Sequence, residues 1–232
     1  MISFRDVTKI YYLNERESMP IPALQDINLQ IDKKEFVSIV GKSGSGKTTL
    51  LRLLLGEEKP TRGEVLFEDK NIHKLKSSEL PSLRRKIGVV FQDYKLISSK
   101  TTYENIAYAM EVIGASDEAI QRDVSEILGI VGLANRANHF PDELSGGEKQ
   151  RMSIARALIH RPEVILADEP TGNLDPYHTK DIINLLLKIY DLGTTIVIAS
   201  HNKEIVNSLK KRVVTLENGK IIRDEKKGRF VF

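Results

Sequence analysis

The sequence predicts an α/β fold with a largely parallel sheet, an antiparallel β subdomain at the N-terminus and an inserted helical subdomain. Short β-like runs alternate with helical patterns, which is typical of strands joined by crossover helices. Near the start, the apolar runs 2–7 and 27–31 flank a polar loop with Pro20 and Pro22, which favours an antiparallel hairpin. The later strands are expected at 36–40, 64–67, 87–91, 164–168, 195–200 and 212–217.

The long segment of about residues 95–160 contains no good strand candidate. Within it, apolar residues recur at helical spacing and predict a helix with one apolar face: Ile120, Val124, Ile127, Leu128 and Val131. No Ser/Gly/Pro-rich linker divides the 232 residues, so we expect one domain over 1–232. In it, residues 1–94 and 161–232 form the core and about 95–160 the helical subdomain.

Composition limits the classes of function that the chain can have. The 35 basic and 32 acidic residues nearly balance, with a net charge of +3, which gives no support for nucleic-acid binding. The chain has no cysteine, which excludes disulfides and thiolate metal sites. Its apolar runs are far shorter than the ~20 residues of a membrane helix. Because Arg5 and Asp6 interrupt the first apolar stretch, we expect no secretory signal and a cytoplasmic protein.

A glycine-rich loop follows the strand predicted at 36–40. Residues 41–48 read GKSGSGKT, match the pattern G-x-x-x-x-G-K-[ST] and precede a helical run at 49–55. In such a loop the backbone N–H groups converge on phosphate oxygens, Lys47 reaches the β and γ phosphates of ATP, and Thr48 binds Mg²⁺. The alternative is a glycine-rich turn that binds nothing, but the flanking strand and helix favour the phosphate loop. The ATP-binding residues expected here are Gly41, Lys42, Ser43, Gly44, Ser45, Gly46, Lys47, Thr48 and Thr49.

Two acids end the apolar strand predicted at 164–168. Asp168 and Glu169 therefore lie at the carboxyl edge of the sheet, where ligands of α/β proteins bind. Asp168 is expected to bind Mg²⁺, and Glu169 to orient and polarise the attacking water. Two acids that merely cap the next turn are the alternative, and the upstream phosphate loop favours the catalytic interpretation.

A second candidate phosphate site begins at Ser145. Ser145 and Glu148 have the spacing of a capping box, which stabilises a helix start by roughly 1 kcal/mol and needs no ligand. The capping box leaves Gly146 and Gly147 unexplained, because glycine in a helix costs about 1 kcal/mol relative to alanine. Close approach of a phosphate to the helix N-terminus would explain both glycines.

Two phosphate cradles could form two nucleotide sites or two halves of one site shared across a dimer. Residues 41–48, the LSGGE segment at 144–148, the acids Asp168 and Glu169, and a histidine, His201, after a strand resemble four motifs of ABC ATPases. These motifs are the Walker A loop, the signature, the Walker B acids and the switch histidine. The resemblance covers essentially the whole chain. It implies a homodimer on ATP binding, in which Ser145 contacts the γ-phosphate held by the other subunit's Lys47.

The same resemblance implies roles for four further residues. Gln92 resembles the Q-loop glutamine that binds Mg²⁺ and links it to the helical subdomain. Asp175 resembles the D-loop aspartate that touches the other subunit. Tyr11 resembles the aromatic residue that stacks on adenine, although Tyr12 would replace it if the strand register shifted by one. The switch histidine, His201, acts in catalysis with Glu169 and Lys47.

Finer likenesses point to a branch of the family. LRRKIGVVFQDYKL at 83–96, TTYENIA at 101–107 and ADEPTGNLD at 167–175 resemble the ATPases of bacterial cell division and their relatives in lipoprotein release and macrolide export. The loop 12–22 looks more like that of the export relatives, so both roles stay open. Either role implies an integral membrane partner and a peripheral position on the inner face of the cell membrane. The long coiled coils or zinc cysteines of DNA-repair ATPases do not occur between the motifs.

Overall fold

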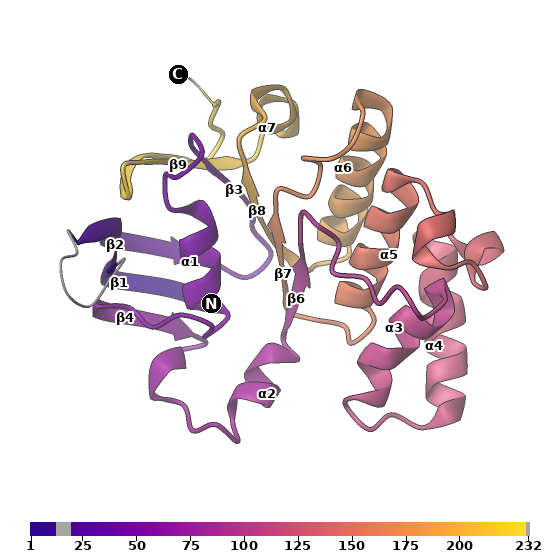
Figure 1. Cartoon of the computed structure of the whole chain (residues 1–232). Helices are drawn as coiled ribbons and strands as arrows, with labels where there is room; N and C mark the ends of the chain where they lie inside the picture. Colours follow the sequence, from indigo (N-terminus) through magenta and orange to yellow (C-terminus); the bar gives the residue numbers. More distant parts are fainter. Residues whose placement is uncertain (13–19, 231–232) are drawn as a thin grey trace. The chain divides into compact units, whose positions relative to one another are not determined.

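The computed structural model describes residues 1–12 and 20–230, and its chain forms two compact units (Figure 1). The first unit comprises Met1–Arg84 with Thr195–Phe232, and the second comprises Arg85–Thr194. Most of the predicted loop at 12–22 lies outside the described residues. The division into a core, 1–94 with 161–232, and a helical subdomain at about 95–160 stays a prediction.

The N-terminal part of the first unit is an antiparallel sheet with the strand order β2-β1-β4-β5. Its strands are β1 (Ile2–Tyr11), β2 (Ile21–Ile31), β4 (Arg62–Phe67) and β5 (Lys70–Asn71). The predicted pairing of the first two apolar runs is confirmed, with Ile2 opposite Ile31 and Phe4 opposite Leu29. Pro22 lies inside β2 and not in the loop; β2 is an edge strand, where a missing N–H is tolerated.

The second sheet of the first unit is built mainly on parallel strand pairs. β3 (Phe36–Val40) pairs in parallel with β8 (Thr195–Ser200) and β9 (Arg212–Glu217), and every residue of β3 and β8 is buried. Such continuous apolar runs are expected where both faces of a sheet are covered. β10 (Lys220–Glu225) returns from β9 through a tight turn in which Asn218 and Gly219 have positive φ. The helices of this unit are α1 (Lys47–Leu54), η1 (Ile72–Lys74), α2 (Leu80–Arg84) and α7 (Lys203–Leu209).

The second unit contains one parallel strand pair and most of the helices. β6 (Ile87–Val90) pairs with β7 (Val164–Asp168). The helical elements are α3 (Thr102–Glu111), α4 (Asp117–Ile130), η2 (Ala134–Arg136), η3 (Pro141–Glu143), α5 (Gly146–Leu158) and α6 (Pro176–Asp191). The apolar face predicted from residue spacing is confirmed: all five of its residues are buried, four of them on α4 and Val131 directly after it.

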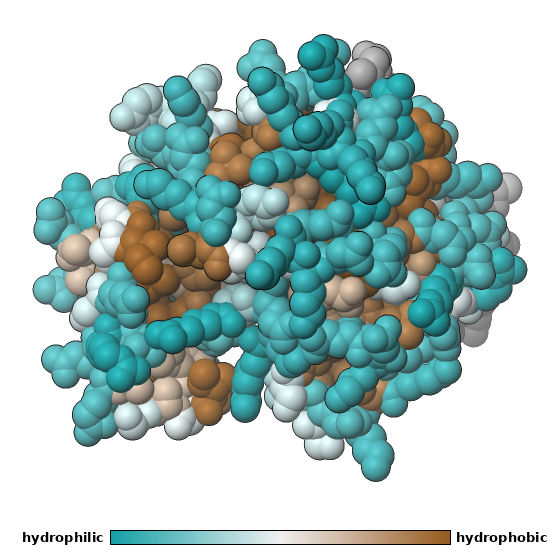
Figure 2. Space-filling view, turned by 180° about the vertical axis from the view of Figure 1, so that it is seen from behind, coloured by the Kyte–Doolittle hydropathy of each residue, from teal (hydrophilic) through white to brown (hydrophobic). Residues whose placement is uncertain are grey.

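Most of the face shown in Figure 2 is hydrophilic, with separate hydrophobic patches between the polar side chains. Among the described residues, no helix combines the length and the apolar composition that crossing a membrane requires.

The contact between β6 and α5 depends on a glycine. A Cβ atom on Gly88 would lie 2.4 Å from the carbonyl oxygen of Ala157, a backbone atom on α5 that cannot rotate away. A Cβ atom added to Gly129 on α4 would have no atom of another segment within 4 Å. We predict that Gly88→Ala lowers the free energy of unfolding by about 1–3 kcal/mol, as overpacked cores do. Gly129→Ala, the matched control, should raise it by up to about 1 kcal/mol because alanine favours helix. Urea unfolding of both variants tests the pair, and equal effects would contradict the packing argument.

Candidate functional site

The loop between β3 and α1 passes very close to the backbone of other segments of its unit. A Cβ atom on Gly41 would lie 2.3 Å from the carbonyl oxygen of Leu216 on β9. A Cβ atom on Gly46, whose φ is 105°, would lie 2.5 Å from the carbonyl oxygen of Ala23 on β2. Only glycine fits these two positions, so packing as well as ligand access determines the glycine pattern of the loop.

Main-chain hydrogen bonds tie the same loop to the turn between β9 and β10. The N–H of Gly219 donates to the carbonyl oxygen of Ser45 (3.2 Å), and the carbonyl oxygen of Gly219 accepts from the N–H of Gln25 (2.8 Å). Inside the loop, the N–H of Ser45 donates to Lys42 O (3.1 Å). The loop is therefore held from two sides before any ligand binds.

The loop presents donors that suit a phosphate. Lys47 is buried, and its Nζ donates to the carbonyl oxygens of Gly41 (2.8 Å) and Lys42 (3.1 Å). Among the described residues, the buried hydroxyl of Ser45 has no hydrogen-bond partner, which is unfavourable unless a ligand supplies one. A phosphate oxygen would supply this acceptor and would also accept from Lys47. The residues present thus fit the phosphates of a nucleotide.

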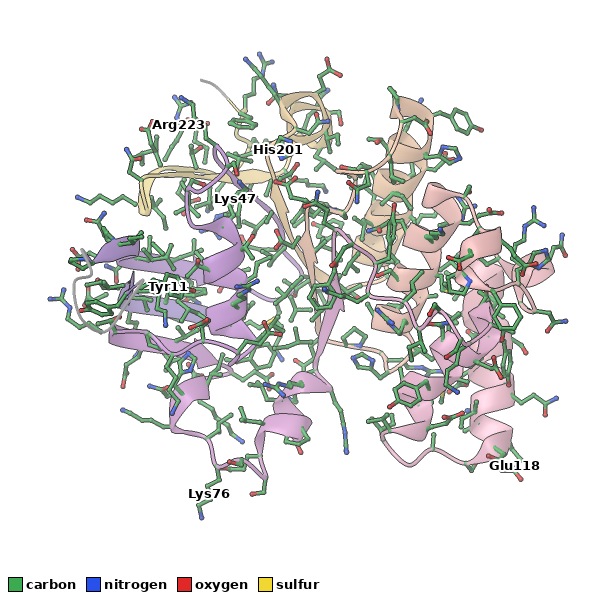
Figure 3. The ribbon with its side chains drawn as sticks, in the orientation of Figure 1. Tyr11, Lys47, Lys76, Glu118, His201 and Arg223 are labelled. Carbon is green, nitrogen blue, oxygen red and sulfur yellow. The ribbon has the colours of Figure 1, made fainter. Side chains whose placement is uncertain are left out.

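Two other predicted site residues belong to the same unit. Val40 pairs with Ser200, so the phosphate loop and His201 both begin at the carboxyl ends of adjacent parallel strands. Tyr11 lies near the end of β1, opposite Ile21, with Lys9 Nζ 4.8 Å from its ring centroid. Figure 3 labels Tyr11 on β1, Lys47 at the start of α1 and His201 after β8. Tyr12 follows the end of β1 and is 64% exposed, whereas Tyr11 is half-buried, and the assignment of Tyr11 to adenine stays a prediction.

In the second unit, another pair of parallel strands aligns Gln92 with the two acids. Val90 pairs with Ala167, so the segments with Gln92 and with Asp168 and Glu169 leave the same edge of the strand pair. Glu169 has a φ of 47°, a left-handed conformation that is uncommon for a residue other than glycine. Strain of this kind is concentrated at functional sites, because it must be held by the surrounding structure.

The segment after Glu169 packs directly on Gln92. Asn173 Nδ2 donates to the carbonyl oxygen of Gln92 (3.0 Å). A Cβ atom on Gly172 would lie 3.0 Å from Gln92 Nε2, so a larger residue would push the glutamine side chain aside. The structure therefore ties the backbone of Gln92 to the loop that follows the acids, and Gly172 of that loop borders the glutamine side chain.

Ser145 is the N-cap of α5 and forms a complete capping box with Glu148. The Glu148 carboxylate accepts from the Ser145 N–H (2.9 Å) and Oγ (2.8 Å), and Ser145 Oγ accepts from the Glu148 N–H (3.3 Å). Arg136 Nε adds a third donor to this carboxylate at 2.9 Å. The backbone hydrogen bond from Ser145, followed by the interactions with Arg136 and the Ser145 hydroxyl, lowers the pKa of Glu148 to about 2. The capping interpretation is thus confirmed, and Ser145 remains exposed to meet a ligand.

The two glycines after Ser145 have a packing role that the sequence did not reveal. A Cβ atom on Gly147 would lie 2.4 Å from the imidazole Cδ2 of His178 on α6. On Gly146 it would lie 3.3 Å from Leu174 and 3.4 Å from the hydroxyl of Tyr94. Packing against His178 therefore accounts for Gly147 without a ligand, and the contact of both glycines with a phosphate stays a prediction.

Asp175 has a structural role within its own chain as the N-cap of α6. Its Oδ1 accepts from the N–H groups of Tyr177 (2.9 Å) and His178 (3.0 Å), and its Oδ2 is hydrogen-bonded to His178 Nδ1. These interactions with His178 lower the pKa of Asp175. Sequence reasoning missed His178 and Asn173, since a contact between distant segments leaves no local pattern.

Comparison with known proteins agrees with this geometry. The family described as "ABC transporter" matches residues 24–172. The chain belongs to this family, and its activity is ATP hydrolysis. Within the family it is similar to the cell division ATP-binding protein FtsE of Mycobacterium tuberculosis, with 52% identity covering 98% of this chain and 97% of the relative. FtsE of Bacillus subtilis is 47% identical, with 99% and 98% covered.

The fold comparison reaches the same family. A dimeric ATP-binding cassette solved in a post-hydrolysis state with ADP and Pi has a TM-score of 0.88 and 38% identity. The match covers 99% of this chain and 100% of that structure. The predicted fold class, with its N-terminal antiparallel sheet, is confirmed.

The capping box makes the stability of α5 depend on pH. Because the pKa of Glu148 is about 2 in the folded chain and about 4.3 when unfolded, ionised Glu148 stabilises the fold fully above pH ~4.3. This contribution is lost progressively as the pH falls from about 4.3 towards 2. We predict that Glu148→Gln lowers the urea midpoint at pH 6, and that its difference from the parent shrinks below pH 4.3. A difference that stays constant over this range would contradict the assigned pKa.

Proposed function

We propose that the chain binds MgATP with its phosphate loop and hydrolyses it with the acids after β7. Lys47 and the loop hold the phosphates, and Tyr11 stacks on adenine. Mg²⁺, which the family's chemistry requires, would be held by Thr48, Gln92 and Asp168. The buried, unpartnered hydroxyl of Ser45 among the described residues supports the phosphate site.

Glu169 is the proposed general base. It would polarise the water that attacks the γ-phosphate, with His201 as the second catalytic group. The left-handed backbone of Glu169 supports this role, because such unfavourable conformations are concentrated at functional sites. Catalysis would depend on positioning and electrostatics, since phosphoryl transfer needs little covalent chemistry from the protein.

A homodimer is the proposed active form. Ser145, Gly146, Gly147 and Glu148 would contact the ATP bound to the other subunit, and Asp175 would touch that subunit. The exposed Ser145 at a helix N-terminus supports this arrangement, because free N–H groups there favour an anion. The dimeric cassette with ADP and Pi, which is similar over nearly the whole chain, adds support.

Cell division is the proposed cellular role. The FtsE relatives match over nearly their full length as well as that of this chain, which supports a shared role. The chain would then work beneath an integral membrane partner resembling FtsX, at the inner face of the cell membrane. ATP-driven closure of the dimer would be transmitted through the partner to control peptidoglycan hydrolysis. A lipoprotein-release or macrolide-type exporter is the alternative.

The catalytic assignment has a direct test. We predict that Glu169→Gln retains ATP binding but lowers kcat by about 10²–10⁴, as expected when a general base is removed. The variant should also accumulate as an ATP-bound dimer in size-exclusion chromatography, because hydrolysis no longer reopens it. Glu126→Gln, which neutralises an exposed acid on α4, is the matched control and should behave as the parent. Hydrolysis by Glu169→Gln at the parent rate would show that another group acts as base.

The cellular role is tested by isolating the complex. We predict that the full chain with an affinity tag, purified from native membranes after crosslinking, brings down an FtsX-like membrane protein. Expression of Glu169→Gln in the same cells should block division, because the trapped dimer would occupy the partner. Recovery of an export permease instead, with normal division, would favour the alternative. Untagged cells serve as the control for nonspecific recovery.

A further inference from the structure

The backbone just after Gln92 has an unusual conformation. Tyr94 and Lys95 are consecutive residues with φ values of 60° and 49°, both in the left-handed region. Neither is a glycine, so each carries a steric cost that the surrounding structure must offset. The N–H of Lys95 donates to the carbonyl oxygen of Asp93 (2.6 Å), which closes a tight turn. We call residues 93–95 the Q-loop turn.

One side chain holds both carbonyl groups of this strained pair. Arg156 on α5 donates from Nη1 to the carbonyl oxygen of Lys95 (2.6 Å) and from Nη2 to that of Tyr94 (2.8 Å). The planar guanidinium presents these donors at a fixed spacing, which suits two successive carbonyl oxygens. An ammonium group has no such fork. The contact is therefore specific for arginine.

The charge of Arg156 is compensated by peptide dipoles. Within the described part of the chain, no carboxylate lies at salt-bridge distance from it. Burial lowers the pKa of Arg156, which shows that the guanidinium is partly removed from water. Its hydrogen bonds are strengthened by that environment, because a charged donor with little competing solvent is worth more than a neutral one.

Gln92 is held from the other side as well. Asn173, in the loop after Glu169, donates to the carbonyl oxygen of Gln92, and Gly172 borders the glutamine side chain. The Q-loop turn therefore lies between Arg156 on α5 and the loop that follows the acids. Since Ser145 is the N-cap of α5, the same helix carries the signature glycines and Arg156, which binds the Q-loop turn.

We propose that Arg156 is a positioning residue, which fixes Gln92 through the two carbonyl groups of the Q-loop turn. This proposal rests on the proposed role of Gln92 at the MgATP site. Arg156 touches neither nucleotide nor metal ion in this proposal. It sets where Gln92 stands, and it couples that position to the helix of the signature.

The test compares variants of the full chain. Arg156→Met removes both donors and keeps an apolar stem, and Arg156→Lys keeps the charge without the fork. Gln92→Ala removes the residue that Arg156 is proposed to position. Arg122→Met is the matched control, because Arg122 is an exposed arginine of the same unit whose partner is the adjacent Asp123. Steady-state kcat, KM for ATP, the half-saturating Mg²⁺ concentration and the melting temperature are measured for each.

Positioning predicts a specific pattern. Arg156→Met should lower kcat about ten- to a hundredfold, because small misplacements have effects of this size, while KM changes less than about twofold. The half-saturating Mg²⁺ concentration should rise in both Arg156→Met and Gln92→Ala. The double variant, Arg156→Met with Gln92→Ala, should have a kcat no lower than that of Gln92→Ala alone, because both changes act through Gln92. Amide hydrogen exchange of residues 92–96 should accelerate in Arg156→Met. Arg122→Met should match the parent in every measurement.

Other outcomes overturn the proposal. Arg156→Met could have a lower melting temperature while its kcat, its Mg²⁺ dependence and its amide exchange at residues 92–96 equal those of the parent. Arg156 would then only stabilise the fold. If Arg156→Met does not fold, Arg156→Lys decides, and parent behaviour of that variant would reject the fork. The failure of the proposed function is distinguishable: Gln92→Ala would then hydrolyse ATP at the parent rate. A slow Gln92→Ala beside a normal Arg156→Met would reject only the positioning role.

Discussion

Parallel strand pairing is the constraint on which the placement of the predicted site residues in each unit depends. In the first unit, the pairing of β3 with β8 brings the phosphate loop and His201 to one edge. In the second unit, the pairing of β6 with β7 does the same for Gln92 and the two acids. A shift of one residue in either register would turn the following side chains to the opposite face. The buried, continuously apolar strands specify these registers, because a shifted pair would leave core side chains mismatched.

Helix α5 connects three features that are separate in the sequence. Its first residues carry the signature glycines, its N-cap Ser145 is held by Glu148, and Arg156 near its end binds the Q-loop turn. The capping box and the proposed signature contact would use the same exposed serine, so local stability and ligand binding would be compatible at one residue. A capping box, which stabilises a helix start, can therefore also belong to a proposed ligand site.

Three of the unfavourable backbone conformations lie where function is proposed. Glu169, Tyr94 and Lys95 all have positive φ, and all belong to the second unit. Each is held by its surroundings: Gly172 N–H donates to the carbonyl oxygen of Glu169, and Arg156 binds the other two. Glycines in the phosphate loop serve the opposite purpose. Gly41 and Gly46 avoid clashes that any side chain would create, so the loop needs no such support.

The sequence by itself determined the family and most of the strand positions, and it predicts the residues that carry the chemistry. These follow from local signals: the spacing of GKSGSGKT, the apolar runs before the acids and the helical period of α4. Only the tertiary structure decided that Pro22 belongs to a strand, that Gly147 makes room for His178, and that Arg156 holds the Q-loop turn. Strand β10 also escaped prediction, because its charged residues lack alternation and its pairing with β9 defines it. The physical reason is common to all four: each depends on pairing or packing with another segment, and composition or spacing within one segment does not record which segment lies opposite.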